Sequence, residues 1–183
     1  FMAEEGAIDY VSGLGNSDVK NARYFRSVSQ KPSLFFRVSI NARAPLGGFL
    51  AFWEDTWDEI TKHKDWFLHK RAGQRLIDSL YNTRMLDPGH GGWQGHWAER
   101  VKAALKSNIY SGVRVDMVYD KLDGWTKNDL SKDYDADTFH KNMVSLLKAI
   151  KQAAGSAPVQ INAMFPVHDG TIPRYQRLIA EVD

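Results

Sequence analysis

The residues best suited to chemistry are concentrated in one short stretch. Four glycines, two histidines and two tryptophans occur within Asp87–Trp97, which reads DPGHGGWQGHW. Histidine can bind a metal or transfer a proton near neutral pH, and glycine lets a ligand approach the backbone closely. The stretch is the first candidate for a functional site, with His90 and His96 as metal ligands. The alternative is a purely structural turn that joins two helices under buried tryptophans.

Further candidate residues follow the three predicted strands. Arg43 follows the first strand, Asp120 the second, and His168 and Asp169 the third. Ligands of parallel sheets bind beyond the carboxyl ends of the strands, so we expect these side chains to meet at one edge. In this hypothesis Asp120 and Asp169 complete the metal shell, and His168 and His90 act in catalysis. Arg43 would stabilise developing negative charge.

These residues need a scaffold, and the hydrophobic pattern predicts an α/β (or α+β) fold. We expect a small, largely parallel sheet of three to four strands, packed with several helices in a single domain. Residues 1–30 are a polar lead-in, and residues 31–183 form the globular domain. Alternating and β-branched residues predict strands at 34–42, 113–119 and 159–167. Helical spacing predicts helices at 49–60, 72–80, 97–106 and 135–150, and from 171 onward.

The composition excludes several classes of protein. The absence of cysteine removes disulfides, thiolate nucleophiles and Cys-ligated zinc. The formal net charge of +2 is too small to argue for nucleic-acid binding by itself. No apolar run approaches the roughly 20 residues of a membrane helix, and no signal peptide is visible, so we expect a soluble protein. Phe1 precedes Met2, which suggests a cloning remnant on a fragment of a larger or secreted protein.

Residues 82–101 resemble the second half of His-Asn-His nuclease domains of bacterial polymorphic toxins. The resemblance rests on Asn82, the Pro-Gly-His turn ending at His90, then His96 and a helix with Val101. It implies that His and Asn hold one divalent ion and that an upstream histidine activates water against a phosphodiester. That family has a β-hairpin before the Asn, where this sequence predicts a helix.

A shorter resemblance concerns Asp87–Gly92. Its sequence DPGHGG is identical to the zinc-binding segment of N-acetylmuramoyl-L-alanine amidases, which implies that His90 binds zinc. In that family the segment ends the first strand, and a Glu ligand lies further downstream than Glu99 does here.

The leading hypothesis is therefore a metal-dependent hydrolase, a phosphodiesterase or nuclease of bacterial effector or toxin type. It would use zinc or magnesium or manganese, and nucleic acid or another phosphodiester as substrate. A second hypothesis is a non-catalytic, immunity-type interaction domain whose Trp93 and Trp97 contact a protein partner. A third is a zinc-dependent peptidoglycan amidase.

Overall fold

The central element of the protein is a sheet of four parallel strands in the order β1-β2-β6-β7. The computed structural model describes residues 10–11, 23–24, 27, 33–42, 57–78, 82–119, 134–163 and 172–182. The strands of this sheet are β1 (Tyr10–Val11), β2 (Ser33–Ser39), β6 (Gly112–Val118) and β7 (Val159–Ala163).

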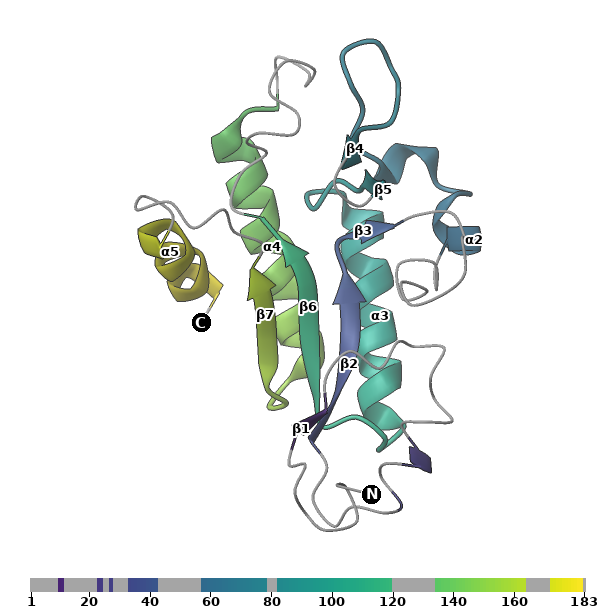
Figure 1. Ribbon diagram of the computed structural model, residues 1–183, viewed down its shortest axis with the longest axis vertical. Coiled ribbons are helices and arrows are strands. Elements are labelled where there is room, and N and C mark those ends of the chain that lie inside the picture. The colour runs from purple at the N-terminus through teal and green to yellow at the C-terminus, as the bar shows by residue number, and fades with distance from the viewer. Residues whose placement is uncertain are drawn as a thin grey trace.

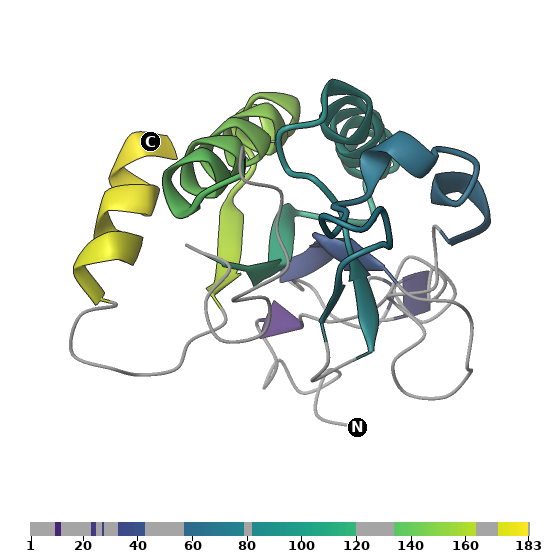
Figure 2. The same ribbon diagram turned by 90° about the horizontal axis from the view of Figure 1, so that it is seen from above.

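Two long helices, α3 (Gly91–Lys106) and α4 (Ala136–Ala154), lie side by side on one face of the sheet (Figures 1 and 2). The strand order follows the chain order. Because parallel crossovers share one hand, successive helices fall on the same face. A sheet wound in one direction with helices on one face is the arrangement found in (β/α)8 barrels. The last helix is α5 (Ile172–Val182).

The core lies between the sheet and the two helices. On the helix-facing side, Val38 pairs with Val115, and both are fully buried. They belong to one apolar cluster with Val101 of α3 and Leu147 of α4. Alternate strand residues supply this cluster, because successive side chains of a strand point to opposite faces.

A second, antiparallel sheet begins where β2 leaves the first. Its strands are ordered β3-β5-β4, and Figure 1 shows them beyond the carboxyl end of β2. Their bounds are β3 (Asn41–Ala42), β4 (Ile77–Asp78) and β5 (Thr83–Met85). The short helices α2 (Trp57–Ile60) and η3 (Lys64–Trp66) precede β4.

Local chemistry explains the ends of α4. The Asp135 side chain accepts a hydrogen bond from the Thr138 amide at 2.7 Å, which satisfies one of the donors that a helix start leaves unpaired. Gly155 follows the last turn at φ 60°, a conformation that glycine adopts without a steric cost.

The α/β fold prediction is confirmed. Of the predicted strands, 34–42 is divided into β2 and β3, 113–119 is β6, and 159–167 is β7 as far as 163, where this run of described residues ends. The helices predicted at 97–106 and 135–150 are α3 and α4, of which α3 begins six residues earlier and α4 ends four residues later. The helix predicted at 72–80 is wrong. Gly73, at φ +82°, turns the chain, and Leu76 is buried while Ile77 is exposed. This alternation of burial is that of a strand. The segment forms β4 and an antiparallel bridge between His69 and Arg75.

Of the helix predicted at 49–60, the structure describes Trp57–Ile60 as α2. The division into a lead-in at 1–30 and a domain at 31–183 stays a prediction. Among the described residues, no helix has the length and apolar character needed to span a bilayer.

Candidate active site on the polar face of the sheet

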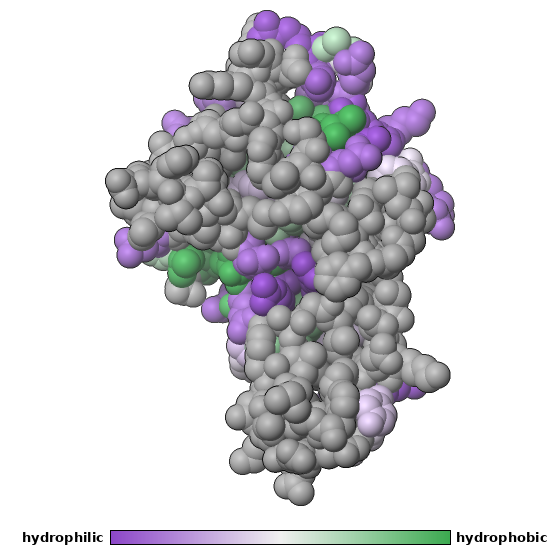
Figure 3. All heavy atoms as spheres, viewed as in Figure 1, coloured by the Kyte–Doolittle hydropathy of each residue, from purple (hydrophilic) through white to green (hydrophobic). Residues whose placement is uncertain are grey.

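The face of the parallel sheet opposite the helices carries polar side chains. Arg37 pairs with Arg114, Ser39 with Asp116, and Arg114 with Gln160. Paired residues of parallel strands share a face, so these side chains lie together on the side away from α3 and α4. Figure 3, which looks onto this side, shows hydrophilic side chains near the level where β6 and β7 end in Figure 1.

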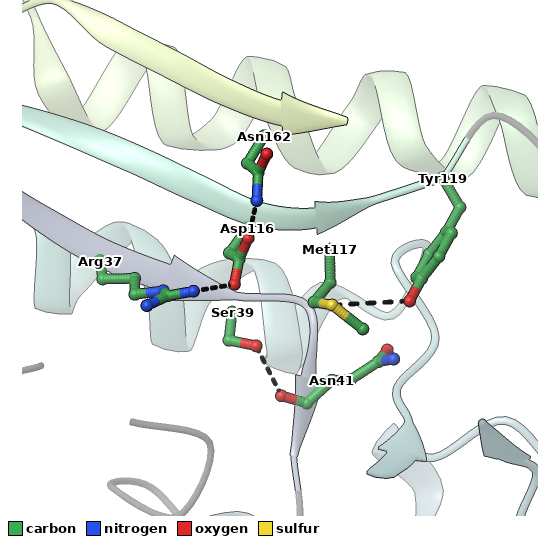
Figure 4. Close-up of polar contacts among 7 residues, drawn as sticks. All are labelled: Arg37, Ser39, Asn41, Asp116, Met117, Tyr119 and Asn162. Atoms are coloured by element: carbon green, nitrogen blue, oxygen red, sulfur yellow. Dashed lines mark hydrogen bonds and ion pairs between the residues drawn. The ribbon is translucent and has the colours of Figure 1, made fainter. Parts of the chain in front are cut away.

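Asp116 of β6 is the centre of this polar layer. Only 2% of the residue is exposed. Arg37 of β2 forms an ion pair with Oδ2 of Asp116, and the Asn162 amide of β7 donates a hydrogen bond to Oδ1 (Figure 4). A carboxylate this deeply buried must be paired and hydrogen-bonded to be tolerated. Both of its oxygens therefore face donors from the two neighbouring strands.

The backbone is strained directly after Asp116. Met117 has φ 63°, a left-handed conformation that costs a non-glycine residue about 1–3 kcal/mol. The pairing of β6 with β7 also shifts register between Val115 and Val118. Irregularities of this kind reorient side chains next to active sites. The strain therefore makes the carboxyl end of β6 a candidate functional position.

Hydrogen bonds connect this end of the sheet to the antiparallel sheet. The Ser39 hydroxyl donates to the Asn41 carbonyl at 2.8 Å, and the Asn41 amide donates to Thr83 Oγ1 of β5 at 3.1 Å. The Tyr119 hydroxyl, just after β6, donates to Asp78 Oδ2 of β4 at 3.2 Å. The antiparallel sheet thus supports the edge where Asp116 lies.

Sequence reasoning missed Arg37, Asp116 and Asn162. The signal was present in the strand segments, where polar residues occupy every second position, as in VRVDMVY and VQINA. Parallel strands covered on both faces are nearly continuous in hydrophobic residues. A regularly polar face therefore makes this side of the sheet a candidate for ligand binding.

His90 has a structural role in the described contacts. Its Nδ1 accepts a hydrogen bond from the Gly92 amide at 3.1 Å, and it is the N-cap of α3. Its Nε2 lies 3.1 Å from Asp65 Oδ2. Both ring nitrogens are thus engaged, Nδ1 by the helix cap and Nε2 by the Asp65 carboxylate.

His96 lies in an aromatic cluster formed with Trp66, Trp93 and Trp97. Its ring stacks on Trp93 with centroids 5.4 Å apart. Burial lowers the pKa of His96, and the positive charge of Arg100 adds to this, while Glu59 opposes it. His96 Nδ1 lies 3.3 Å from Glu59 Oε1.

Two of the four glycines of the Gly/His loop (Asp87–Trp97) serve close packing within the protein. A Cβ on Gly89 would collide with the Asn142 side chain of α4, and one on Gly92 would lie 2.6 Å from Trp66 Nε1. The Asp87 side chain accepts a hydrogen bond from the Gly89 amide at 2.8 Å. A turn, a helix cap and close packing thus account for Asp87, Gly89, His90 and Gly92, whereas a Cβ on Gly91 or Gly95 would meet nothing within 4 Å.

The other predicted site residues lie outside the described residues. These are Arg43, Asp120, His168 and Asp169. Within the part of the chain that the structure describes, no three His, Asp or Glu side chains converge as a metal site. The roles predicted for these four residues, and the binding of a divalent cation, stay predictions.

Comparison with protein families decides the relationship of the chain. Residues 48–175, more than half of it, match the sequence profile of hypothetical glycosyl hydrolase family 15. The chain belongs to this family. No curated protein matches the chain.

Solved structures similar to this glycosyl hydrolase family member share its fold. A hypothetical protein from Ruminiclostridium thermocellum superposes with a TM-score of 0.52 at 13% identity, over 79% of this chain and 64% of its own. A family 36 α-galactosidase from Geobacillus stearothermophilus, solved with stachyose, superposes with a TM-score of 0.52 at 15% identity. The match covers 82% of this chain and 19% of the α-galactosidase.

A third similar structure is a cycloalternan-degrading enzyme from Trueperella pyogenes. It gives a TM-score of 0.50 at 11% identity, over 81% of this chain and 21% of its own. The chain therefore spans about a fifth of the length of these two enzymes and less than two thirds of the clostridial protein.

The family match overturns the predictions of a His-Asn-His nuclease or toxin, an amidase, and a nucleic-acid or phosphodiester substrate. The short resemblances arose because turn, cap and close packing require the same residue types in the Gly/His loop. The predicted protein-contact role of the tryptophans is also wrong. Trp93 is 0% exposed and Trp97 is 3% exposed, so neither forms a contact surface.

The packing of Gly89 gives a test of the loop's structural role. We expect Gly89→Ala to lower the free energy of unfolding by about 1–2 kcal/mol, because Asn142 must move away from Asp87 and Tyr134. Gly95→Ala is the matched control, since a Cβ there meets nothing within 4 Å. It should stabilise α3 by about 0.5–1 kcal/mol. Equal urea denaturation curves for the two variants would contradict this.

The lowered pKa of His96 gives a pH test. Below pH 6.5 the unfolded chain gains a proton at His96 that the folded chain resists, so stability should fall as the pH falls from 7.5 to 5.5. His96→Phe keeps a stacking ring but cannot titrate, so its stability should fall less over this pH range. Glu59→Gln removes the charge that opposes the lowering of the His96 pKa, so its stability should fall more. Urea denaturation at both pH values measures this. A fall in His96→Phe as large as in the wild type would refute it.

Proposed function

We propose that the chain contributes part of the sugar-hydrolysing site of a glycoside hydrolase, with Asp116 as one of its carboxylates. The supporting observation is the Arg37–Asp116–Asn162 arrangement on the polar face of the sheet. Membership of a glycosyl hydrolase family agrees with it. In (β/α)8 barrels, whose parallel strands likewise follow the chain order, the active sites lie at the carboxyl ends of the strands.

The partners of Asp116 favour one of the two roles that carboxylates take in glycoside hydrolysis. One carboxyl group protonates the leaving oxygen, and the other remains ionised to attack or to activate water. Both oxygens of Asp116 accept hydrogen bonds, from the Arg37 guanidinium and the Asn162 amide. Neither donor takes up a proton, so Asp116 fits the ionised role. Asp120 and Asp169, predicted at strand ends, are candidates for the proton donor.

In this proposal, the strain at Met117 and the fixed strand register serve to hold the Asp116 carboxylate in place. Transition-state stabilisation requires a carboxylate held in place before the substrate binds. Arg37 and Asn162 come from the strands on either side of β6, so the sheet itself fixes both oxygens. The small antiparallel sheet adds support from the carboxyl end. Sugars are the proposed substrate class, and the chain would form this site together with further elements of a longer enzyme.

Substitution of Asp116 tests the proposal. The longer enzyme that contains the chain would be assayed against aryl glycosides and oligosaccharides, including the α-galactosides stachyose and raffinose. We expect Asp116→Asn, which keeps the shape and removes the charge, to lower kcat/KM by about 10²–10⁴-fold.

Asp137→Asn is the matched control, because Asp137 is an exposed carboxylate in the first turn of α4. It should leave hydrolysis unchanged. Circular dichroism should show that both variants keep the fold. Wild-type hydrolysis rates in Asp116→Asn would overturn the assignment.

A further inference from the structure

Two tyrosines border the connection between β6 and α4. Tyr119 follows the last residue of β6, and Tyr134 precedes Asp135, the N-cap of α4. Residues 120–133 join them. This connection leaves the sheet three residues after Asp116, so the position of its two ends bears directly on the candidate site.

Each tyrosine hydroxyl donates to a carboxylate. Tyr119 reaches Asp78 Oδ2 at 3.2 Å and Tyr134 reaches Asp87 Oδ1 at 2.6 Å. Asp78 is the last residue of β4, and Asp87 lies two residues after β5. The two contacts therefore attach both ends of one connection to adjacent parts of the antiparallel sheet, which is far from them in sequence.

The carboxylates are themselves held in place. Asp78 is 0% exposed and pairs across the sheet with Thr83. Asp87 Oδ1 also accepts from the Gly89 amide, its backbone amide donates to the Trp66 carbonyl at 2.8 Å, and Asn142 of α4 donates to the Tyr134 hydroxyl at 3.1 Å. Hydrogen bonds to charged acceptors are about twice as strong as neutral ones.

The Tyr119 tether also contacts the strained residue beside Asp116. The Tyr119 hydroxyl lies 3.6 Å from Met117 Sδ (Figure 4). Burial raises the pKa of Tyr134, and the Asp87 carboxylate adds to this effect, so that hydroxyl remains a donor at neutral and moderately alkaline pH. A left-handed methionine persists only where its surroundings fix it, and the Tyr119–Asp78 contact supplies such a restraint.

We propose that Asp78 and Asp87 are positioning residues, which hold the two ends of the β6–α4 connection through Tyr119 and Tyr134 and so fix Asp116 for catalysis. The role in catalysis rests on the proposed glycoside hydrolase function. The tethering itself does not, so the two can be tested separately.

The test compares a Tyr119→Phe/Tyr134→Phe double variant with Tyr110→Phe. Tyr110 is a buried tyrosine near the other end of β6, so its variant controls for loss of a hydroxyl as such. We expect amide exchange at residues 117–119 and 134–138 to be at least about tenfold faster in the double variant, because each tether is a charge-assisted hydrogen bond. Tyr110→Phe should exchange there as the wild type does.

Kinetics and a conservative variant separate positioning from general stability. With a hydrolysed glycoside, we expect the double variant to lower kcat about 10–100-fold and to change KM little. Asp78→Asn keeps an oxygen that accepts from Tyr119 and should retain most of kcat, whereas Asp78→Leu should lose it. If Asp78→Leu fails to fold, the tyrosine variants still decide whether the tethers position Asp116.

Two results would overturn the proposal. Exchange at 117–119 and 134–138 that matches the Tyr110→Phe control would show that there is no tether. Faster exchange with unchanged kcat would show that the tether does not position Asp116. If the longer enzyme that contains the wild-type chain hydrolyses no glycoside, the proposed function fails, and the exchange measurement still decides whether the tethers exist.

Discussion

The buried charge of Asp116 is the constraint on which the site depends. An ionised carboxylate removed from water is costly unless a counter-charge and hydrogen-bond donors surround it. Arg37 supplies the charge from β2, and Asn162 supplies a donor from β7. Both contacts require the three strands to keep one register. The helices achieve this from the other face, where the apolar strand residues pack against α3 and α4.

The antiparallel sheet extends this constraint to the loops. Asn41, Asp78 and Asp87 connect it to the carboxyl end of the parallel sheet and to the two ends of the β6–α4 connection. The polar layer is thus part of a wider set of buried or half-buried hydrogen bonds. Hydrogen bonds made where water is excluded are electrostatically stronger than in water, and they hold their partners in place. This provides a physical reason for the strained Met117 to persist next to Asp116.

The sequence allowed prediction of the parts of the fold that local patterns determine. Alternation in 34–42 and 113–119 and the apolar stripe of 136–154 located the main strands and the clearest helix. The segment 72–80 was mispredicted because Leu76 and Ile77 fit a helical spacing as well as an alternating one. A turn at Gly73 and pairing with β5 decided between them, and pairing with a distant strand is not visible in a short window.

The candidate site was harder to predict, because its residues are far apart in sequence. Arg37, Asp116 and Asn162 meet only once the register of three strands is known. The Gly/His loop resembled a metal site because helix capping and close packing select some of the same residue types. A crystal structure of the protein with a bound oligosaccharide is the most direct test of the role of Asp116. We expect a sugar within hydrogen-bond distance of the Asp116 carboxylate or of Arg37. A sugar bound at His90 and His96 with the polar face empty would contradict it.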